Sequence, residues 1–249
     1  MSDLAIIGGT GLTTLNGLNI ARREMRRTPY GEPSAPFIHG DFCGTEVVFL
    51  ARHGSGHTIP PHRVNYKANL WALQDMGVRR VIAVAAVGGI RPDMVPGRIA
   101  FPDQIIDYTY GRAQTFFEDD LSNVTHIDFT EPYCGELRGH LIQVARDLEL
   151  GAVEDGTYGA TQGPRLETAA EINRLERDGC DLVGMTGMPE AALAREMELC
   201  YCACSVVANW AAGRGAGPIS LESIDANLKS GMVKVRTLLE QAIPGMCGR

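Results

Sequence analysis

Short apolar runs rich in β-branched residues alternate along this chain with segments of helical periodicity. This alternation is typical of α/β proteins, in which helices flank a central sheet. Several of the runs are apolar throughout, which indicates strands that are covered on both faces. The pattern predicts strands at residues 4–7, 46–51, 80–87, 98–107, 156–161, 181–186 and 200–208. It predicts helices at residues 65–76, 133–148, 167–178, 189–197 and 221–243.

Nothing in the pattern divides the chain. No Pro/Gly/Ser-rich linker, charge run or repeat interrupts its 249 residues, and 45% of them are hydrophobic. A chain of this length and composition can bury a sizeable core. We therefore expect a single domain over residues 1–249.

Charge and hydropathy limit the choice of partners. The net charge is −7 and no Lys/Arg cluster is present, whereas binding to nucleic acid depends on neutralising phosphates. No apolar run approaches the roughly 18 residues that a membrane span needs, and no signal-peptide pattern opens the chain. The expectation is a cytoplasmic protein that binds neither nucleic acid nor a membrane.

Three of the seven cysteines, Cys200, Cys202 and Cys204, alternate along one predicted strand. Alternation places their side chains on one face of the sheet. A metal site would need CxxC spacing and a fourth ligand, and both are missing here. We interpret the three as buried, reduced thiols, because a disulfide framework is not expected in the cytoplasm.

Three turns that come directly after predicted strands have the composition of anion sites. They read Gly-Gly-Thr-Gly at residues 8–11, Ala-Ala-Val-Gly-Gly at 85–89 and Met-Thr-Gly-Met-Pro-Glu at 185–190. Bare backbone N–H groups, hydroxyls and helix N-termini all favour anions. The first turn lacks the third glycine of a dinucleotide fingerprint and the Gly-Lys-Ser/Thr of a Walker loop.

Arg52 and His53 follow another predicted strand directly. An arginine fork binds phosphate oxygens bidentately, and a neighbouring imidazole adds a further polar contact. His53, His57 and His62 fall within ten residues and raise the alternative of a metal site. That alternative is weak, because no HExxH motif and no nearby carboxylate accompany them.

Glu167 and Asn209 suggest which base the protein holds. A carboxylate accepts a hydrogen bond from a protonated ring nitrogen, and a carboxamide both donates and accepts. This pair suits a 6-oxopurine. Adenine has no proton on N1 and would leave the carboxylate unpaired, at a cost of roughly 1–3 kcal/mol.

The ordered motifs resemble the trimeric purine nucleoside phosphorylase and methylthioadenosine phosphorylase family over nearly the whole chain. Besides the segments above, they include Val-Asn-Tyr-Lys-Ala-Asn at residues 64–69, Trp-Ala-Leu at 71–73 and Gly-Pro-Arg at 163–165. The resemblance implies one mixed central sheet flanked by helices and a homotrimer or a dimer of trimers. It also implies a purine nucleoside as substrate, inorganic phosphate as co-substrate, and no cofactor or metal.

The resemblance assigns roles to individual residues. The expected phosphate ligands are Thr10, Arg52, His53, the Ala86 backbone and Thr186. Asn209 and Glu167 are expected to be catalytic, since they stabilise charge developing on the purine. The expected nucleoside contacts are Met185, Leu166, His126, Ile219, Leu221 and Ile224. His126 matches a histidine that methylthioadenosine phosphorylases contribute from the adjacent subunit; the weaker alternative is an interface histidine that bonds to backbone.

Three positions depart from the family. Leu166 stands where many members have a stacking Phe, and Ala85 replaces a Thr or Asn. Ala211 replaces the second of two Asp residues that take a 6-amino group in methylthioadenosine phosphorylases. A 6-oxopurine site beside a methylthio-specific remainder predicts phosphorolysis of S-methyl-5′-thioinosine to hypoxanthine and 5-methylthioribose 1-phosphate. The alternatives are methylthioadenosine phosphorylase, inosine/guanosine phosphorylase and a non-catalytic nucleoside-binding protein.

Overall fold

The computed structural model describes residues 2–119 and 123–246. All five predicted helices are confirmed, with ends displaced by at most two residues. They are α1 (Tyr66–Asp75), α2 (Gly135–Asp147), α3 (Ala169–Arg177), α4 (Gly187–Glu196) and α5 (Leu221–Ala242), with short 3₁₀ turns η1 (Pro61–Arg63) and η2 (Pro244–Met246). Asn65 caps α1 by accepting from the Ala68 N–H, and Ser220 caps α5 by accepting from the Ser223 N–H. These caps satisfy N–H groups that the first turn of a helix leaves free.

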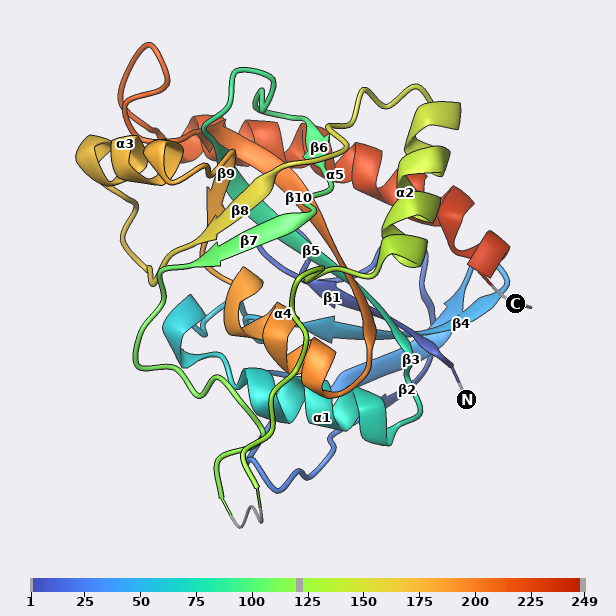
Figure 1. Ribbon diagram of the computed structural model, residues 1–249. Helices are drawn as coiled ribbons and strands as arrows, with labels where there is room; N and C mark the ends of the chain where they lie inside the picture. Colours follow the sequence, from blue (N-terminus) through green and yellow to red (C-terminus); the bar gives the residue numbers. More distant parts are fainter. Residues whose placement is uncertain (1, 120–122, 247–249) are drawn as a thin grey trace.

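The described strands form one mixed sheet. They are β1 (Leu4–Gly8), β2 (Asn19–Glu24), β3 (Phe37–Phe42), β4 (Thr45–Ala51), β5 (Arg80–Gly89), β6 (Ile99–Ala100), β7 (Gln104–Asp107), β8 (Thr157–Ala160), β9 (Leu182–Gly184) and β10 (Cys200–Trp210). Their order is β2-β3-β4-β1-β5-β9-β8-β7, and β10 pairs with both β5 and β6. Helices α1 and α4 lie on one side of the sheet, and α2 and α5 lie on the other (Figure 1). The expected α/β architecture with a mixed sheet is confirmed.

A split in the sheet creates room for a site. On one side β5 pairs with β1 only as far as Ala83, and β9 joins that side only at Gly88. Along its other side β5 pairs with β10 over its whole length. Between β1 and β9, no described strand pairs with residues 84–87. The carboxyl ends of β1 and β4 and the ends of β8 and β9 therefore border this opening.

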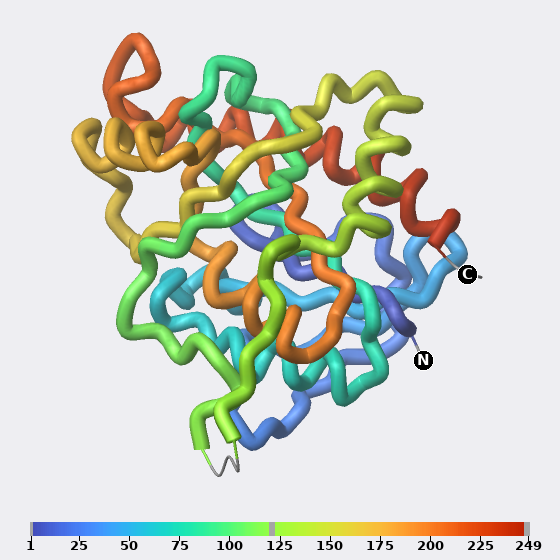
Figure 2. Tube along the Cα trace, in the orientation of Figure 1, coloured from blue at the N-terminus to red at the C-terminus, as the bar shows by residue number. Residues whose placement is uncertain are grey.

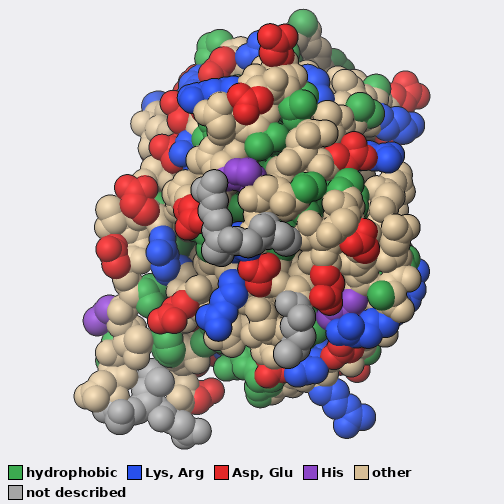
Figure 3. All heavy atoms as spheres, turned by 90° about the vertical axis from the view of Figure 1, so that its right-hand side faces the viewer, with side chains coloured by type: hydrophobic (Ala, Val, Ile, Leu, Met, Phe, Trp, Pro, Cys, Tyr) green, Lys and Arg blue, Asp and Glu red, His purple; other side chains and the backbone are tan. Residues whose placement is uncertain are grey.

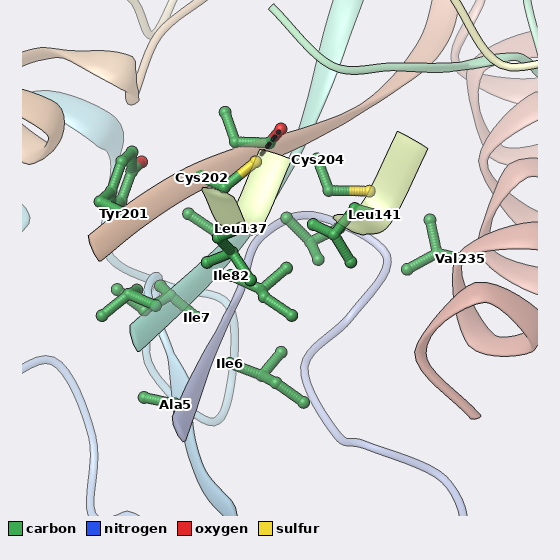
Figure 4. Close-up of a cluster of buried hydrophobic side chains, with 14 of the residues drawn as sticks. Ala5, Ile6, Ile7, Ile82, Leu137, Leu141, Tyr201, Cys202, Cys204 and Val235 are labelled. Carbon is green, nitrogen blue, oxygen red and sulfur yellow. Dashed lines mark hydrogen bonds between the residues drawn. The ribbon is translucent and has the colours of Figure 1, made fainter. Parts of the chain in front are cut away.

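One part of the main core fills the space between the sheet and α2 and α5. Ile6 of β1, Ile82 of β5 and Val235 of α5 are fully buried there (Figure 4). Leu137 and Leu141 on α2 pack against the same cluster.

The cysteine prediction was partly wrong. Cys202 and Cys204 are fully buried free thiols on the core face, as expected, and burial raises the pKa of both. Cys200, however, forms a disulfide with Cys134, the residue before α2. The two Cα atoms are 5.0 Å apart, within the range that a disulfide spans. The contact between α2 and the start of β10 determines this pairing, and no spacing in the sequence indicates it.

The predicted strand at residues 98–107 was also wrong, because it is two strands. Pro102 lies between β6 and β7, and it has no N–H to donate to a ladder. β6 pairs with β10, whereas β7 pairs with β8. The pattern missed β2 and β3 altogether.

The loop between β7 and α2 leaves the sheet and runs past α4 before it returns (Figure 2). Thr115 Oγ1 and the Phe116 N–H both donate to the Glu196 carboxylate at the end of α4. Lys67 of α1 pairs with Glu118 at 3.0 Å. These contacts hold the described part of the loop against two helices.

The surface is mixed in charge. Acidic and basic side chains are interspersed on the face seen in Figure 3. No helix in the described residues is long and apolar enough to cross a membrane. Among those same residues, no group of three or more His, Cys, Asp or Glu is arranged to hold a metal ion.

Candidate functional site

A cavity of about 350 Å³ lies at the split in the sheet. Its walls come from the ends of β1, β4, β5, β9 and β10, from the loop after β8 and from the first turns of α5. Ligand sites of open α/β sheets collect at such strand ends. The cavity is large enough for a nucleoside-sized ligand.

Arg52 is held rigidly at the base of this cavity. Its Nε and Nη2 donate to the two carboxylate oxygens of Glu190 at 2.6 and 2.7 Å. Its Nη1 donates at 2.9 Å to the Val84 carbonyl, which belongs to the segment of β5 that lacks a neighbouring strand on that side. Burial acts to lower the pKa of Arg52, but the Glu190 charge and its hydrogen bonds outweigh burial and raise it. Two of the five guanidinium protons remain for a ligand.

Glu190 receives a further hydrogen bond. The Tyr201 hydroxyl on β10 donates to Glu190 Oε1 at 2.8 Å. Arg52 and Glu190 are each 1% exposed, so the pair is isolated from bulk water. Because Arg52 and Glu190 neutralise each other, this part of the site carries little net charge before an anion enters.

His53 adds an acceptor to the cavity wall. Its Nδ1 lies 2.8 Å from the Ile59 carbonyl, which can only accept, so Nδ1 carries the proton. Burial, and then the neighbouring Arg52 charge, lower the pKa of His53 to about 4. The ring is therefore neutral near pH 7 and its Nε2 has a free lone pair. Among the described residues, the hydrogen bond of the His53 ring is the one made by Nδ1.

Three more groups complete the anion region. Thr10 Oγ1 lies 3.4 Å from His57 Nε2, and both residues line the cavity. Thr186 precedes α4 and is buried at the cavity wall. Along β5, successive residues direct their backbone groups alternately to opposite neighbours. The Ala86 N–H therefore faces the same unpaired side as the Val84 carbonyl.

Glu167 and Asn209 line the same cavity from different elements. Thr161 Oγ1 donates to Glu167 Oε1 at 2.6 Å and orients the carboxylate. A β-bulge between Val207 and Asn209 changes the direction of the end of β10. Asn209 Nδ2 donates one proton to the Trp210 carbonyl, which leaves Oδ1 and a second proton for a ligand.

Aliphatic side chains cover the remaining wall. Ile219 lies just before α5, and Ile224 and Leu228 lie on its first turns. Met185 and Leu166 add apolar surface from the turn after β9 and the loop after β8. One cavity therefore combines an anion-binding wall, two polar groups with complementary hydrogen bonding and an apolar wall.

Comparison with known proteins assigns the chain to a family. The profile of the phosphorylase superfamily matches residues 3–244. The chain belongs to the phosphorylase superfamily. It is 53% identical over 243 residues to a probable S-methyl-5′-thioinosine phosphorylase of Pseudomonas syringae pv. tomato, covering 98% of this chain and 99% of that one.

Two further proteins are similar to this chain over nearly their whole length. The 6-oxopurine nucleoside phosphorylase of Pyrococcus furiosus is 46% identical, with 98% of this chain and 93% of that protein covered. The structure of methylthioadenosine phosphorylase from Schistosoma mansoni in complex with adenine superposes with a TM-score of 0.94 at 31% identity. That superposition covers 99% of this chain and 92% of the other.

The cavity brings together most of the residues predicted from the sequence. The predicted residues that line it are Thr10, Arg52, His53, Ala86, Leu166, Glu167, Met185, Thr186, Asn209, Ile219 and Ile224. Their roles toward a substrate stay predictions.

Two predicted residues lie outside the cavity. Leu221 was expected in the apolar wall and is 83% exposed, because it is the first residue of α5 and projects beyond that wall. His126 is exposed on the loop before α2 and does not line the cavity. Its predicted contact is with a neighbouring subunit's site, so the single chain leaves that prediction untested.

Sequence reasoning also missed part of the site. Leu228 lies one helical turn after Ile224, so the same periodicity would have identified it. His57 was interpreted as a surface or anion-binding histidine without a specific partner, and it contacts Thr10. Glu190 was read as a residue at the start of a helix, and nothing in its local pattern shows that it pairs with Arg52, 138 residues away.

Proposed function

We propose that this protein catalyses phosphorolysis of S-methyl-5′-thioinosine to hypoxanthine and 5-methylthioribose 1-phosphate. The main observation behind this proposal is that Arg52 and Thr186 line one cavity together with Glu167, Asn209 and an aliphatic wall. A superfamily member with 53% identity bears the corresponding name, which supports the assignment. The reaction is a pentosyl transfer to phosphate and requires no cofactor.

The reaction needs a phosphate oriented toward C1′ of the nucleoside. Arg52, Thr10, Thr186 and the Ala86 N–H donate to its oxygens. His53 Nε2 accepts from the remaining P–OH of hydrogen phosphate, because the neutral ring offers a lone pair there. An unprotonated phosphate oxygen attacks C1′ as the C1′–N9 bond breaks. The electron pair of the C1′–N9 bond moves onto the purine. Positioning of this kind contributes several kcal/mol to catalysis.

Glu167 and Asn209 stabilise the departing base. Glu167 accepts from the N1 proton of hypoxanthine, and the free Asn209 amide proton donates to the purine as negative charge develops. One such donor contributes about 2–4 kcal/mol to transition-state stabilisation. The proton that leaves the phosphate balances the proton that the hypoxanthine anion gains.

The aliphatic wall favours a methylthio group over a hydroxyl. A 5′-hydroxyl against Ile219, Ile224 and Leu228 would lose hydrogen bonds to water without replacement. We expect inosine to be used less efficiently than methylthioinosine, by roughly tenfold or more.

A substrate comparison tests this proposal. Methylthioinosine, methylthioadenosine and inosine are assayed side by side, and their kcat/KM values are compared. We expect methylthioinosine to have the highest value and base release to require phosphate. A wide preference for methylthioadenosine would contradict the proposal, and tight binding without any base release would indicate a nucleoside-binding protein.

Asn209→Asp provides a sharper version of this test. An ionised carboxylate accepts from a 6-amino group but cannot donate to the purine. The variant should lose efficiency with methylthioinosine and shift the ratio of kcat/KM toward methylthioadenosine. An unchanged ratio would remove Asn209 from base recognition.

A further inference from the structure

Arg112 makes an unusually complete set of hydrogen bonds beside the cavity. Its Nη1 donates to the carbonyls of Met185 at 2.9 Å and Met188 at 2.6 Å. Its Nη2 donates to the carbonyls of Thr161 at 3.2 Å and Gln162 at 2.8 Å. Its Nε donates to Gln162 Oε1 at 3.1 Å. Arg112 does not itself line the cavity.

These four carbonyls belong to two separate segments, each of which contributes neighbouring residues to the cavity wall. Thr161 and Gln162 follow β8 and lead into the loop that carries Glu167, and Thr161 also binds the Glu167 carboxylate. Met185 and Met188 lie on either side of Thr186. Met188 has φ −117° and ψ 140°, which turns its carbonyl out of the helical ladder and makes it available to Arg112.

The same guanidinium reaches a third wall. Its Cζ lies 5.8 Å from the centre of the Tyr66 ring, and Nη1 lies 3.5 Å from the Tyr66 hydroxyl. That hydroxyl donates at 2.9 Å to the carbonyl of Pro61, which lines the cavity.

We propose that Arg112 is a positioning residue that fixes the base-binding loop after β8 relative to the turn between β9 and α4. This inference rests on the proposed function, since that function assigns Glu167 to the base and Thr186 to phosphate. Arg112 touches no substrate and acts through the main chain of both walls.

The chemistry of the contacts requires arginine. Among the described residues, Arg112 pairs with no carboxylate, and all its acceptors are neutral. A planar guanidinium has five protons in a fixed fork and can reach four converging carbonyls at once. The ammonium of a lysine has three protons at a single point, so Arg112→Lys keeps the charge but loses the geometry.

Arg112→Lys and Arg112→Met test the proposal, with Arg138→Lys as a matched control. Arg138 is also half-buried and ties α2 to main-chain carbonyls, those of Phe101 and Glu154, but away from the cavity. For each variant the thermal midpoint, kcat and the KM values for nucleoside and phosphate are measured.

We expect both Arg112 variants to lose roughly 10- to 100-fold in kcat/KM for the nucleoside, because small misplacements of a reacting group are costly. The KM for phosphate should change less, by no more than about threefold, because Thr10, Arg52 and His53 lie in segments after β1 and β4 that Arg112 does not contact. Arg138→Lys should lower the thermal midpoint and leave all three kinetic constants unchanged.

Two results would overturn the proposal. One is nucleoside kinetics within about twofold of the unaltered protein in Arg112→Lys. The other is a nucleoside defect of the same size in Arg138→Lys at equal loss of stability. If the unaltered protein releases no base from any nucleoside, the proposed function fails instead. Calorimetric affinity for hypoxanthine then decides the Arg112 inference, since weaker binding in Arg112→Lys alone supports it and equal binding contradicts it.

Discussion

At the scale of single residues, the notable feature is a buried ion pair inside an anion site. Arg52 and Glu190 are each 1% exposed, and Tyr201 donates to the same carboxylate. Glu190 fixes the guanidinium and offsets its charge while the cavity is empty. Removing one partner of such a pair leaves an uncompensated buried charge, which is more costly than removing both.

Glu190→Gln should therefore destabilise the protein by about 3–5 kcal/mol. Tyr201→Phe removes a single hydrogen bond to the Glu190 carboxylate, and its cost should be about 1.5–3 kcal/mol because the acceptor is charged. Denaturant unfolding measures both values. Added phosphate should reduce the difference in unfolding free energy between Glu190→Gln and the unaltered protein, because the anion provides a new counter-charge for Arg52. If this difference in unfolding free energy does not depend on phosphate, no anion reaches Arg52.

His53 gives the stability a pH dependence of known sign. Its pKa is about 4 in the folded protein, because of burial and then Arg52, and about 6.5 when unfolded. As the pH falls from about 6.5 to 4, the unfolded chain binds a proton that the folded protein does not, so stability is lost. The contribution of His53 is complete above this window and decreases by about 3 kcal/mol across it.

His53→Asn should flatten the curve of unfolding free energy against pH in that window. Parallel curves for His53→Asn and the unaltered protein would show that the imidazole is protonated equally in both states.

At the scale of elements, one glycine allows β1 and β5 to hold Arg52 between them. A Cβ on Gly9 would lie 2.8 Å from Arg52 Nη1 and 2.6 Å from the Val84 carbonyl. Gly9→Ala should displace the guanidinium and raise the KM for phosphate by about tenfold or more, with a smaller change for nucleoside. Gly139→Ala on α2 is the control, since no heavy atom lies within 4 Å of its Cβ position. Equal KM values for phosphate in Gly9→Ala and Gly139→Ala would argue against a close contact between Gly9 and Arg52.

Periodicity and capping residues made the helices predictable, whereas strands without a regular apolar pattern, such as the exposed β2 and the β3 segment with His39, Gly40 and Asp41, were missed. All residues of β2 are exposed except Glu24, so no apolar alternation indicates a strand there. β2 forms because it completes the backbone ladder of β3 at the edge of the sheet. Pro102 was visible in the sequence, but the different partners of β6 and β7 depend on the sheet as a whole.

The site was predictable where function depends on strand ends and recognisable motifs. Thr10, Arg52 and Asn209 were found in this way. The groups that hold them are distant in sequence: Glu190 supports Arg52, and Arg112 links two loops. Such contacts arise from tertiary packing, so local patterns do not show them. Leu221 was expected in the cavity wall from the resemblance, which does not show where the cavity ends along α5, and it lies outside the cavity of its own chain.

At the scale of the whole molecule, the predicted role of His126 depends on assembly. The residue is exposed and outside the cavity of its own chain. We propose that the protein forms a homotrimer or a dimer of trimers in which His126 reaches the site of an adjacent subunit.

Mixed oligomers test this arrangement. His126→Ala and Asn209→Ala subunits should each be impaired alone. Together they should regain activity in roughly a quarter of the sites, since some sites combine both intact residues. Size-exclusion chromatography of the mixture confirms exchange of subunits. Exchange without any recovery would place His126 outside the shared site.

The split beside β5 also affects how such a site can change over evolutionary time. Val84 and Ala86 direct backbone groups into the opening, and the Val84 carbonyl already binds Arg52. Those groups are the same for any non-proline side chain, so substitutions there preserve the polar contacts as long as the strand keeps its path. Anion recognition is thus partly inherited with the topology, whereas preference for a base or a 5′ substituent depends on replaceable side chains. Relatives can therefore diverge in substrate while they continue to use phosphate.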